Sequence, residues 1–144
     1  MLRLCQALPI ANKTANADVC GLRKISGNHM KKFIRGFRYA YQGLIYAFST
    51  QINFRVHVFS AAIAVLLGVY FELSHSEWIW IACAILLVLI VELLNTAIEV
   101  LVDLVSPDYH PKAGIVKDVS AGAVLLTAIF AVMVGLLIFV PKIL

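Results

Sequence analysis

Three long apolar segments limit what this chain can fold into. They cover about residues 56–73, 78–102 and 119–140, and each approaches the roughly 20 residues that a helix needs to cross a bilayer. Hydrophobic residues make up 62% of the 144 residues and charged residues only 14%, whereas soluble domains have about half and about a quarter. We therefore expect an all-α integral membrane protein with three transmembrane helices.

An amphipathic helix is expected before the first span, over about residues 31–50. Its apolar and aromatic residues recur at helical spacing, and its basic residues occupy the other face, as in helices that lie on a membrane surface. A helix buried against the bundle is the alternative. Residues 1–29 show no sustained period. We interpret 1–29 as a disordered extension and 30–144 as the functional domain, with Met30 as a candidate start.

Positive charge is distributed unevenly along the chain. Eleven of the 12 lysines and arginines precede the first span or lie between the second and third spans, and only Lys142 follows the third. Because lysine and arginine accumulate on the cytoplasmic side of a bilayer, we expect a cytoplasmic N-terminus and a cytoplasmic second loop. The C-terminus is then expected outside.

A polar stripe interrupts the apolar sequence of the second span. The stripe consists of Glu92, Asn95, Thr96, Glu99 and Asp103. Because successive residues of a helix are rotated by about 100°, these five side chains lie within about 100° of arc on one face of the helix. Carboxylates at membrane depth are costly unless they are paired, hydrated or bound to metal, so a functional role is expected for them.

The spacing within the stripe indicates separate roles. Glu99 and Asp103 lie one turn apart near the interface, where Mg²⁺ can bind one or two carboxylates together with substrate phosphates. Glu92 lies about 10 Å deeper by helical rise and is suited to act as a general base. Asn95, one turn away, can orient that carboxyl group or contact a substrate hydroxyl.

The start of the third span adds a cation on the same side of the membrane. Lys117 can neutralise phosphate charge, and helix N-terminal amides favour anions. Asp118 can cap that helix, and the small residues 120–123 let a neighbouring helix approach closely. A capped helix with a packing face is the alternative reading. Together with the stripe, Lys117 predicts phosphoryl transfer from a soluble nucleotide to a lipid hydroxyl.

These motifs resemble the bacterial diacylglycerol kinase and undecaprenol kinase family. The resemblance covers about Lys32 to the C-terminus and rests on ExxNxAIExxxD from Glu92, DYH from Asp108 and KDxxAGA from Lys117. It implies a homotrimer in the bacterial inner membrane that uses ATP and Mg²⁺ and shares active sites between subunits. A lipid substrate is implied as its partner, and no nucleic acid is expected.

The resemblance also implies roles for single residues. Glu92 would be the catalytic base with Asn95 beside it, and Glu99 would bind the metal that bridges the nucleotide phosphates. The other nucleotide-site residues would be Lys32, Tyr39, Asp103, Asp108, Tyr109, His110, Lys117 and Asp118.

Gln51 departs from the pattern of the family. It stands three residues before Phe54, where the family usually has a second metal-binding glutamate. An amide oxygen can ligate a cation but brings no charge, so the metal affinity could fall, a second ion could be lost, or another carboxylate could substitute. We expect activity to be retained, with an inactive paralogue as the alternative.

The acceptor is expected to be undecaprenol or diacylglycerol. Residues 53–57 resemble the undecaprenol kinase branch somewhat more, although His57 taken alone is expected to be an interfacial residue. In a different class of protein, the stripe could line a proton or cation path. Residues 80–91 are apolar, however, so the polar path ends about halfway along the span.

Overall fold

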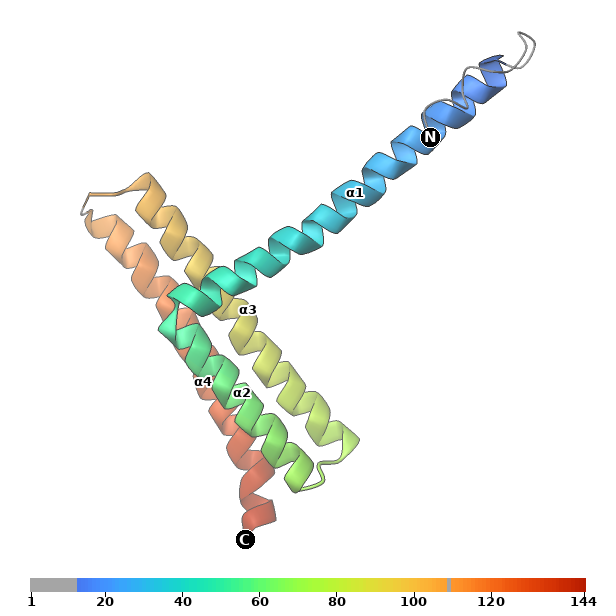
Figure 1. Ribbon diagram of the computed structural model, residues 1–144. Helices are drawn as coiled ribbons and strands as arrows, with labels where there is room; N and C mark the ends of the chain where they lie inside the picture. The colour runs from blue at the N-terminus through green and yellow to red at the C-terminus, as the bar shows by residue number, and fades with distance from the viewer. Residues whose placement is uncertain (1–12, 109) are drawn as a thin grey trace. The chain divides into compact units, whose positions relative to one another are not determined.

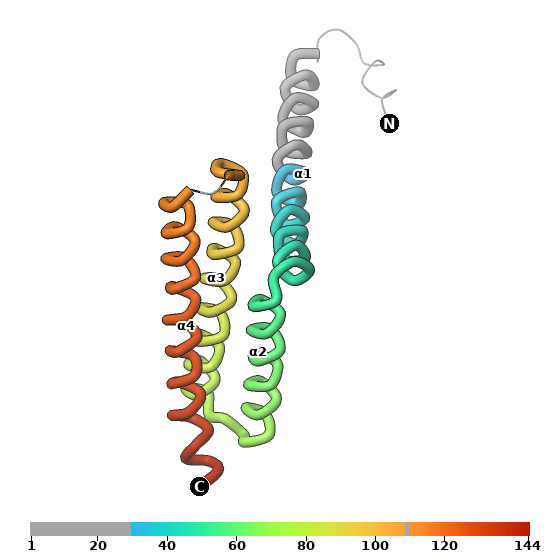
Figure 2. Tube along the Cα trace, turned by 90° about the vertical axis from the view of Figure 1, so that its left-hand side faces the viewer, coloured from blue at the N-terminus to red at the C-terminus, as the bar shows by residue number. Residues whose placement is uncertain are grey.

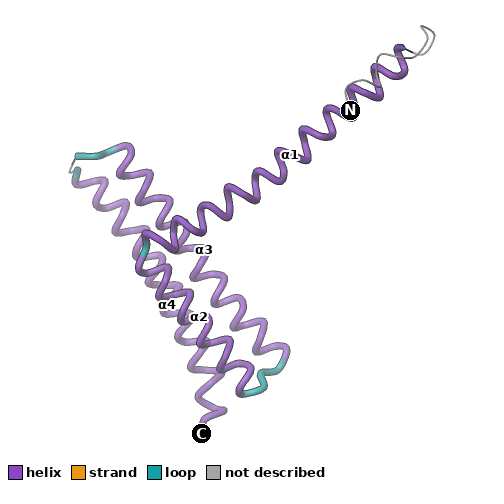
Figure 3. Tube along the Cα trace, in the orientation of Figure 1, coloured by secondary structure: helices purple, strands orange, loops and turns teal. Residues whose placement is uncertain are grey.

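The computed structural model describes residues 13–108 and 110–144, and the side chains of residues 30–108 and 110–144. Within these residues the structure is all helical, without strands (Figure 3). The helices are α1 (Lys13–Thr50), α2 (Ile52–Tyr70), α3 (His75–Val105) and α4 (Pro111–Ile143). Three of them, α2, α3 and α4, are long and apolar enough to cross a membrane. The expected fold class is confirmed.

The chain divides into two units, Met1–Gly43 and Leu44–Leu144. In the first unit, α1 is helical from Lys13, before the expected start near residue 31. No proline interrupts residues 13–50, so the backbone there can stay in one helix. Residues 1–12 of the expected extension lie outside the described residues, and the division at Met30 stays a prediction.

In the second unit, α3 packs against both α2 and α4 (Figures 1 and 2). The buried residues of α3 recur every three or four positions and so share one helical face. They are Ile81, Ala84, Val88, Glu92, Asn95 and Thr96. Toward the α2–α3 turn this face is apolar, and toward the α3–α4 loop it becomes polar. The other apolar side chains are mostly exposed, as expected for helices that face lipid.

The α2–α3 turn is closely packed. Gly68 of α2 is buried, and a Cβ at this position would lie 2.8 Å from Cη2 of Trp78, so a larger residue would displace the indole ring. Ser74 caps α3 in a capping box with Glu77. Glu77 also pairs with Lys142 of α4 (Nζ to Oε1, 3.2 Å). One carboxylate therefore joins the start of α3 to the end of α4.

Replacing Ser74 with alanine should destabilise this end of the bundle. The hydroxyl accepts from the amide of Glu77 and donates to its carboxylate at 2.7 Å, and loss of such a cap costs about 1 kcal/mol of the free energy of unfolding. Denaturant unfolding in detergent micelles measures the change. Ser76→Ala leaves the capping box in place and removes only a 3.2 Å contact with the Ser74 hydroxyl, so it should cost less than about 0.5 kcal/mol. Equal costs for the two variants would contradict a capping role.

Candidate active site

Buried polar side chains gather where α3 packs against α4. Within the part of the chain whose side chains are described, the buried polar residues are Glu92, Asn95, Thr96 and Ser120. Thr96 satisfies its own helix by donating to the carbonyl of Glu92 at 3.0 Å. The other three side chains are therefore the ones that can serve a site. The predicted stripe faces the interior at its deep end and becomes exposed at Asp103.

Glu92 is the most deeply buried of these groups. Its side chain is 1% exposed, and its Oε2 has no hydrogen-bond partner among the described residues. An unsatisfied buried acceptor costs about 1–3 kcal/mol, more when it is charged. Structures retain such groups where they have a functional task or bind a ligand. The position and burial of Glu92 fit a carboxylate that meets a substrate.

A line of hydrogen bonds runs from α4 through α3 to the start of α2. The hydroxyl of Ser120 lies 2.6 Å from Asn95 Oδ1, and Asn95 Nδ2 donates to Glu99 Oε1 at 3.0 Å. From the other side, Gln51 Nε2 donates to Glu99 Oε2 at 3.3 Å. The side chain of Gln51 makes no capping bond to α2. Both oxygens of Glu99 therefore accept from amide groups.

The structure thus brings together Gln51 and Glu99, the two predicted metal ligands. It also adds Ser120, which the sequence indicated only as a small packing residue. A polar residue within a segment that packs closely against another helix is the one signal that could have identified it.

The Gln51–Glu99 pair fits a cation that arrives with phosphate. No three histidine, cysteine, aspartate or glutamate side chains of the described residues converge as a complete metal site. Mg²⁺ keeps several waters and binds through one or two carboxylates plus substrate phosphates. Glu99 supplies one carboxylate, and rotation of the Gln51 amide would turn its oxygen toward the same point. The donor set suits Mg²⁺ held jointly by the protein and a nucleotide.

Four predicted nucleotide-site residues lie around the α3–α4 loop, which projects beyond the start of α2 (Figures 1 and 2). They line one cavity of about 210 Å³. They are Asp103, Asp108, His110 and Lys117. Lys117 Nζ lies 2.5 Å from Asp103 Oδ1, and both side chains are partly or largely exposed. The cavity therefore contains a lysine that is paired with a carboxylate. The ammonium group of this lysine could leave that carboxylate and bind a phosphate group instead.

The remaining predicted residues are placed differently. Asp118 is exposed and does not line this cavity. Tyr109 lies outside the described residues. Lys32 and Tyr39 belong to the first unit and are exposed there.

The expectation that Asp118 caps the third membrane helix is wrong. Helix α4 begins at Pro111, about two turns earlier, and its cap is His110, whose Nδ1 accepts from the amide of Lys112 at 3.2 Å. Proline is favoured at the first position of a helix, so the helix begins in the polar loop, before the apolar segment. Lys117 consequently lies inside α4, away from the free amides of its N-terminus.

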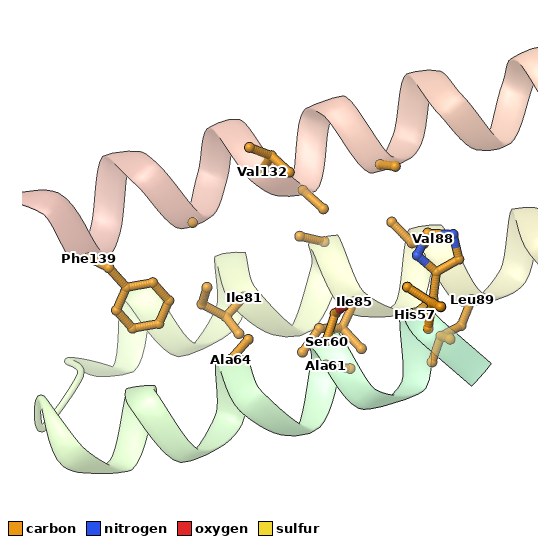
Figure 4. A pocket seen from close by; sticks show the side chains of 15 residues that line it. His57, Ser60, Ala61, Ala64, Ile81, Ile85, Val88, Leu89, Val132 and Phe139 are labelled. Carbon is orange, nitrogen blue, oxygen red and sulfur yellow. The ribbon is translucent and has the colours of Figure 1, made fainter. Parts of the chain in front are cut away.

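An apolar cavity of about 310 Å³ lies between α2, α3 and α4. Figure 4 shows the mostly apolar side chains that line it from all three helices, together with His57 and Ser60 of α2. Val88 and Leu89 precede Glu92 by about one turn, so the cavity leads toward the buried carboxylate. The ring of His57, expected at the interface, lines this cavity. Size, lining and position suit a hydrocarbon chain whose polar end reaches Glu92.

Comparisons with known proteins agree with this arrangement. The sequence model of the family described as prokaryotic diacylglycerol kinase matches residues 38–139. The chain is 47% identical over 127 residues to the diacylglycerol kinase of Synechocystis sp., covering 85% of this chain and 71% of that protein. It is 40% identical over 115 residues to the undecaprenol kinase of Bacillus subtilis, covering 80% and 94%. It is 32% identical over 101 residues to the diacylglycerol kinase of Escherichia coli, covering 70% and 83%.

Proposed function

Because the chain belongs to the prokaryotic diacylglycerol kinase family and is a membrane-embedded lipid kinase, we propose that it transfers the γ-phosphate of ATP, with Mg²⁺, to undecaprenol or diacylglycerol. The observation that carries this proposal is the buried carboxylate of Glu92, whose Oε2 lacks a partner among the described residues. It lies about one helical turn beyond Val88 and Leu89, which line the apolar cavity. The distribution of lysine and arginine supports a site on the cytoplasmic side of the inner membrane.

On the acceptor side, the lipid chain occupies the cavity between α2, α3 and α4, and its hydroxyl group lies against Glu92. As the hydroxyl oxygen bonds to the γ-phosphorus and ADP leaves, the carboxylate takes the hydroxyl proton. Burial keeps water away from the reacting atoms, so the phosphate goes to the lipid and ATP is not hydrolysed. Asn95 lies about one turn from Glu92 on the same helical face, where it would help to orient the lipid hydroxyl group.

On the donor side, the nucleotide lies over the cavity at the α3–α4 loop. Lys117 turns from Asp103 to a phosphate group, and Asp108 and His110 contact the nucleotide. Tyr109 and Asp118 are further proposed residues of the nucleotide site. Glu99 and Gln51 hold the cation. Mg²⁺, when bound, neutralises phosphate charge and aligns the phosphates. Lys32 and Tyr39 of α1 complete the nucleotide site in a homotrimer whose active sites are shared between subunits.

Replacing Lys117 with glutamine should weaken ATP binding. The variant keeps a polar side chain but loses the charge that meets the phosphates, and we expect the KM for ATP to rise about tenfold, equal to about 1.4 kcal/mol. The KM for the lipid should stay unchanged, because the acceptor cavity is separate. Steady-state kinetics with each substrate varied in turn measures both.

The matched control for this prediction is Lys112→Gln. Lys112 is exposed in the first turn of α4 and does not line the α3–α4 cavity. If the two variants raised the KM for ATP equally, the cause would be a general effect of positive charge and not a specific contact between Lys117 and a phosphate group.

The proposed reaction is tested by transfer of labelled γ-phosphate from ATP to each lipid, supplied separately in mixed micelles with Mg²⁺. Labelled undecaprenol or labelled diacylglycerol identifies the acceptor. Transfer to neither lipid by folded protein would refute the proposed acceptors. Residues 53–57 favour undecaprenol, whereas the relatives include kinases named for each lipid.

A conducting role finds no support in the geometry. The buried polar side chains of α3 end at Glu92, and the packing face continues toward the α2–α3 turn with Val88, Ala84 and Ile81. An ion path would need polar groups through the whole depth of the membrane.

A further inference from the structure

Ser120 of α4 is a buried serine with two acceptors within reach. It is 8% exposed, and its hydroxyl lies 2.9 Å from the carbonyl of Lys117 on its own helix and 2.6 Å from Asn95 Oδ1 on α3. A hydroxyl has one proton to donate. A serine that only satisfied its own helix would donate to the carbonyl, as Thr127 does to Val124 at 2.8 Å about two turns later.

The carboxylate of Glu99 determines whether the Ser120 hydroxyl donates its proton to Asn95 Oδ1 or to the carbonyl of Lys117. An ionised carboxylate can only accept hydrogen bonds, so Asn95 must turn its NH₂ group toward Glu99, where Nδ2 lies 3.0 Å from Oε1. The carbonyl oxygen of the Asn95 amide then faces Ser120 and needs a donor. Asn95 itself is 6% exposed, which leaves little room for water to take the place of the serine.

We propose that Ser120 is a positioning residue, whose hydroxyl fixes the orientation of the Asn95 amide and thereby holds Glu99 ready for the cation. The proposal rests on the proposed function, because it takes Glu99 as the carboxylate that meets Mg²⁺. Hydrogen-bond partners of a metal-binding carboxylate set its orientation, and losing one typically costs about 10- to 100-fold in metal affinity or activity.

Without the hydroxyl, the buried oxygen of Asn95 loses its donor. The amide can then relieve the loss only by rotating, which takes its NH₂ group away from Glu99. Glu99 would keep the donor from Gln51 at 3.3 Å but would no longer be held from both sides. The free carboxylate would sample more rotamers, and the cation would bind one fewer preorganised group.

The test compares Ser120→Ala with Thr127→Ala in the full-length protein. Both variants remove one hydroxyl from α4 that lies within reach of the carbonyl three residues earlier, but only the first removes a contact with α3. We expect the Mg²⁺ concentration for half-maximal activity to rise about tenfold in Ser120→Ala, with kcat at saturating Mg²⁺ largely kept. Thr127→Ala should behave as the wild type.

A second measurement does not depend on catalysis. The side-chain NH₂ signals of Asn95 are recorded by ¹⁵N–¹H NMR on nucleotide-free protein in micelles and assigned with Asn95→Asp. The two protons should be widely separated in the wild type and in Thr127→Ala, and should converge in Ser120→Ala as the amide becomes mobile.

Each outcome decides a different claim. Unchanged Asn95 signals in Ser120→Ala would overturn the orienting role. Converging signals with an unchanged Mg²⁺ dependence would overturn the link to the cation. Signals that converge only in Ser120→Ala, together with a wild-type protein that phosphorylates neither lipid, would leave the orienting role in place and refute the proposed function.

Discussion

Glu92→Gln is expected to reduce phosphate transfer to the lipid by about 10²- to 10⁴-fold, the contribution typical of a general base. The amide has nearly the shape of the carboxylate and fits the same buried position, which is 1% exposed. It cannot take the proton of the lipid hydroxyl. The KM for ATP should change little, because the cavity at the α3–α4 loop is lined by other residues. Labelled phosphate transfer under saturating substrates measures the rate.

Glu72→Gln provides the matched control for this prediction. It makes the same chemical change at an exposed carboxylate in the α2–α3 turn, at the opposite end of the bundle from the α3–α4 loop. Its activity should equal that of the wild type. A Glu92→Gln enzyme that is folded and retains more than about a tenth of the activity would rule out a general-base role.

Glu99→Gln is the second change expected to have a large effect. It would leave amides at positions 51, 95 and 99, which are close to one another through the present bonds of Glu99, and no carboxylate among them. A cation held by neutral oxygens alone loses its main attraction to the site. We expect activity at about 1 mM Mg²⁺ to fall about 100-fold, with partial recovery at higher Mg²⁺, as a titration of the rate would show.

A double variant tests whether the position or the charge matters. In Glu99→Gln/Gln51→Glu the carboxylate moves to the other side of the same hydrogen bond, 3.3 Å away. Activity should recover at least in part if the pair binds the cation jointly. Gln51→Glu alone should lower the Mg²⁺ concentration for half-maximal activity, because two carboxylates then face the ion. No recovery in the double variant, despite a folded protein, would assign Glu99 a role other than cation binding.

Much of the fold could be predicted because membrane helices are marked by their composition. The apolar segments indicated α2, α3 and α4, and the spacing of polar residues indicated which face of α3 is buried. The helix ends could not be predicted in the same way. Apolar segments mark where a helix meets lipid, whereas α4 begins at Pro111 in the polar loop, where capping and not hydropathy sets the boundary.

The candidate site was predictable where its residues lie on one helix. Glu92, Asn95 and Glu99 are related by helical periodicity, so their common face follows from their spacing. Ser120 could not be identified as a partner of Asn95, because it lies 25 residues away and the contact depends on the register of α4 against α3. The position of His57 at the apolar cavity likewise depends on how α2 packs.

The amide of Gln51 also affects what the protein needs in order to stay folded. A glutamate at position 51 would place two carboxylates about as close as Gln51 and Glu99 are now. Two such carboxylates repel each other unless a cation lies between them or one of them binds a proton. Here the Gln51 amide donates to Glu99, and the Asn95 amide donates to its other oxygen, so both carboxylate oxygens have partners within the protein. Unlike proteins whose folding requires the metal, this bundle is expected to keep its stability in a chelator. Removal of divalent cations should therefore stop the enzyme without unfolding it, and return of the cation should restart it.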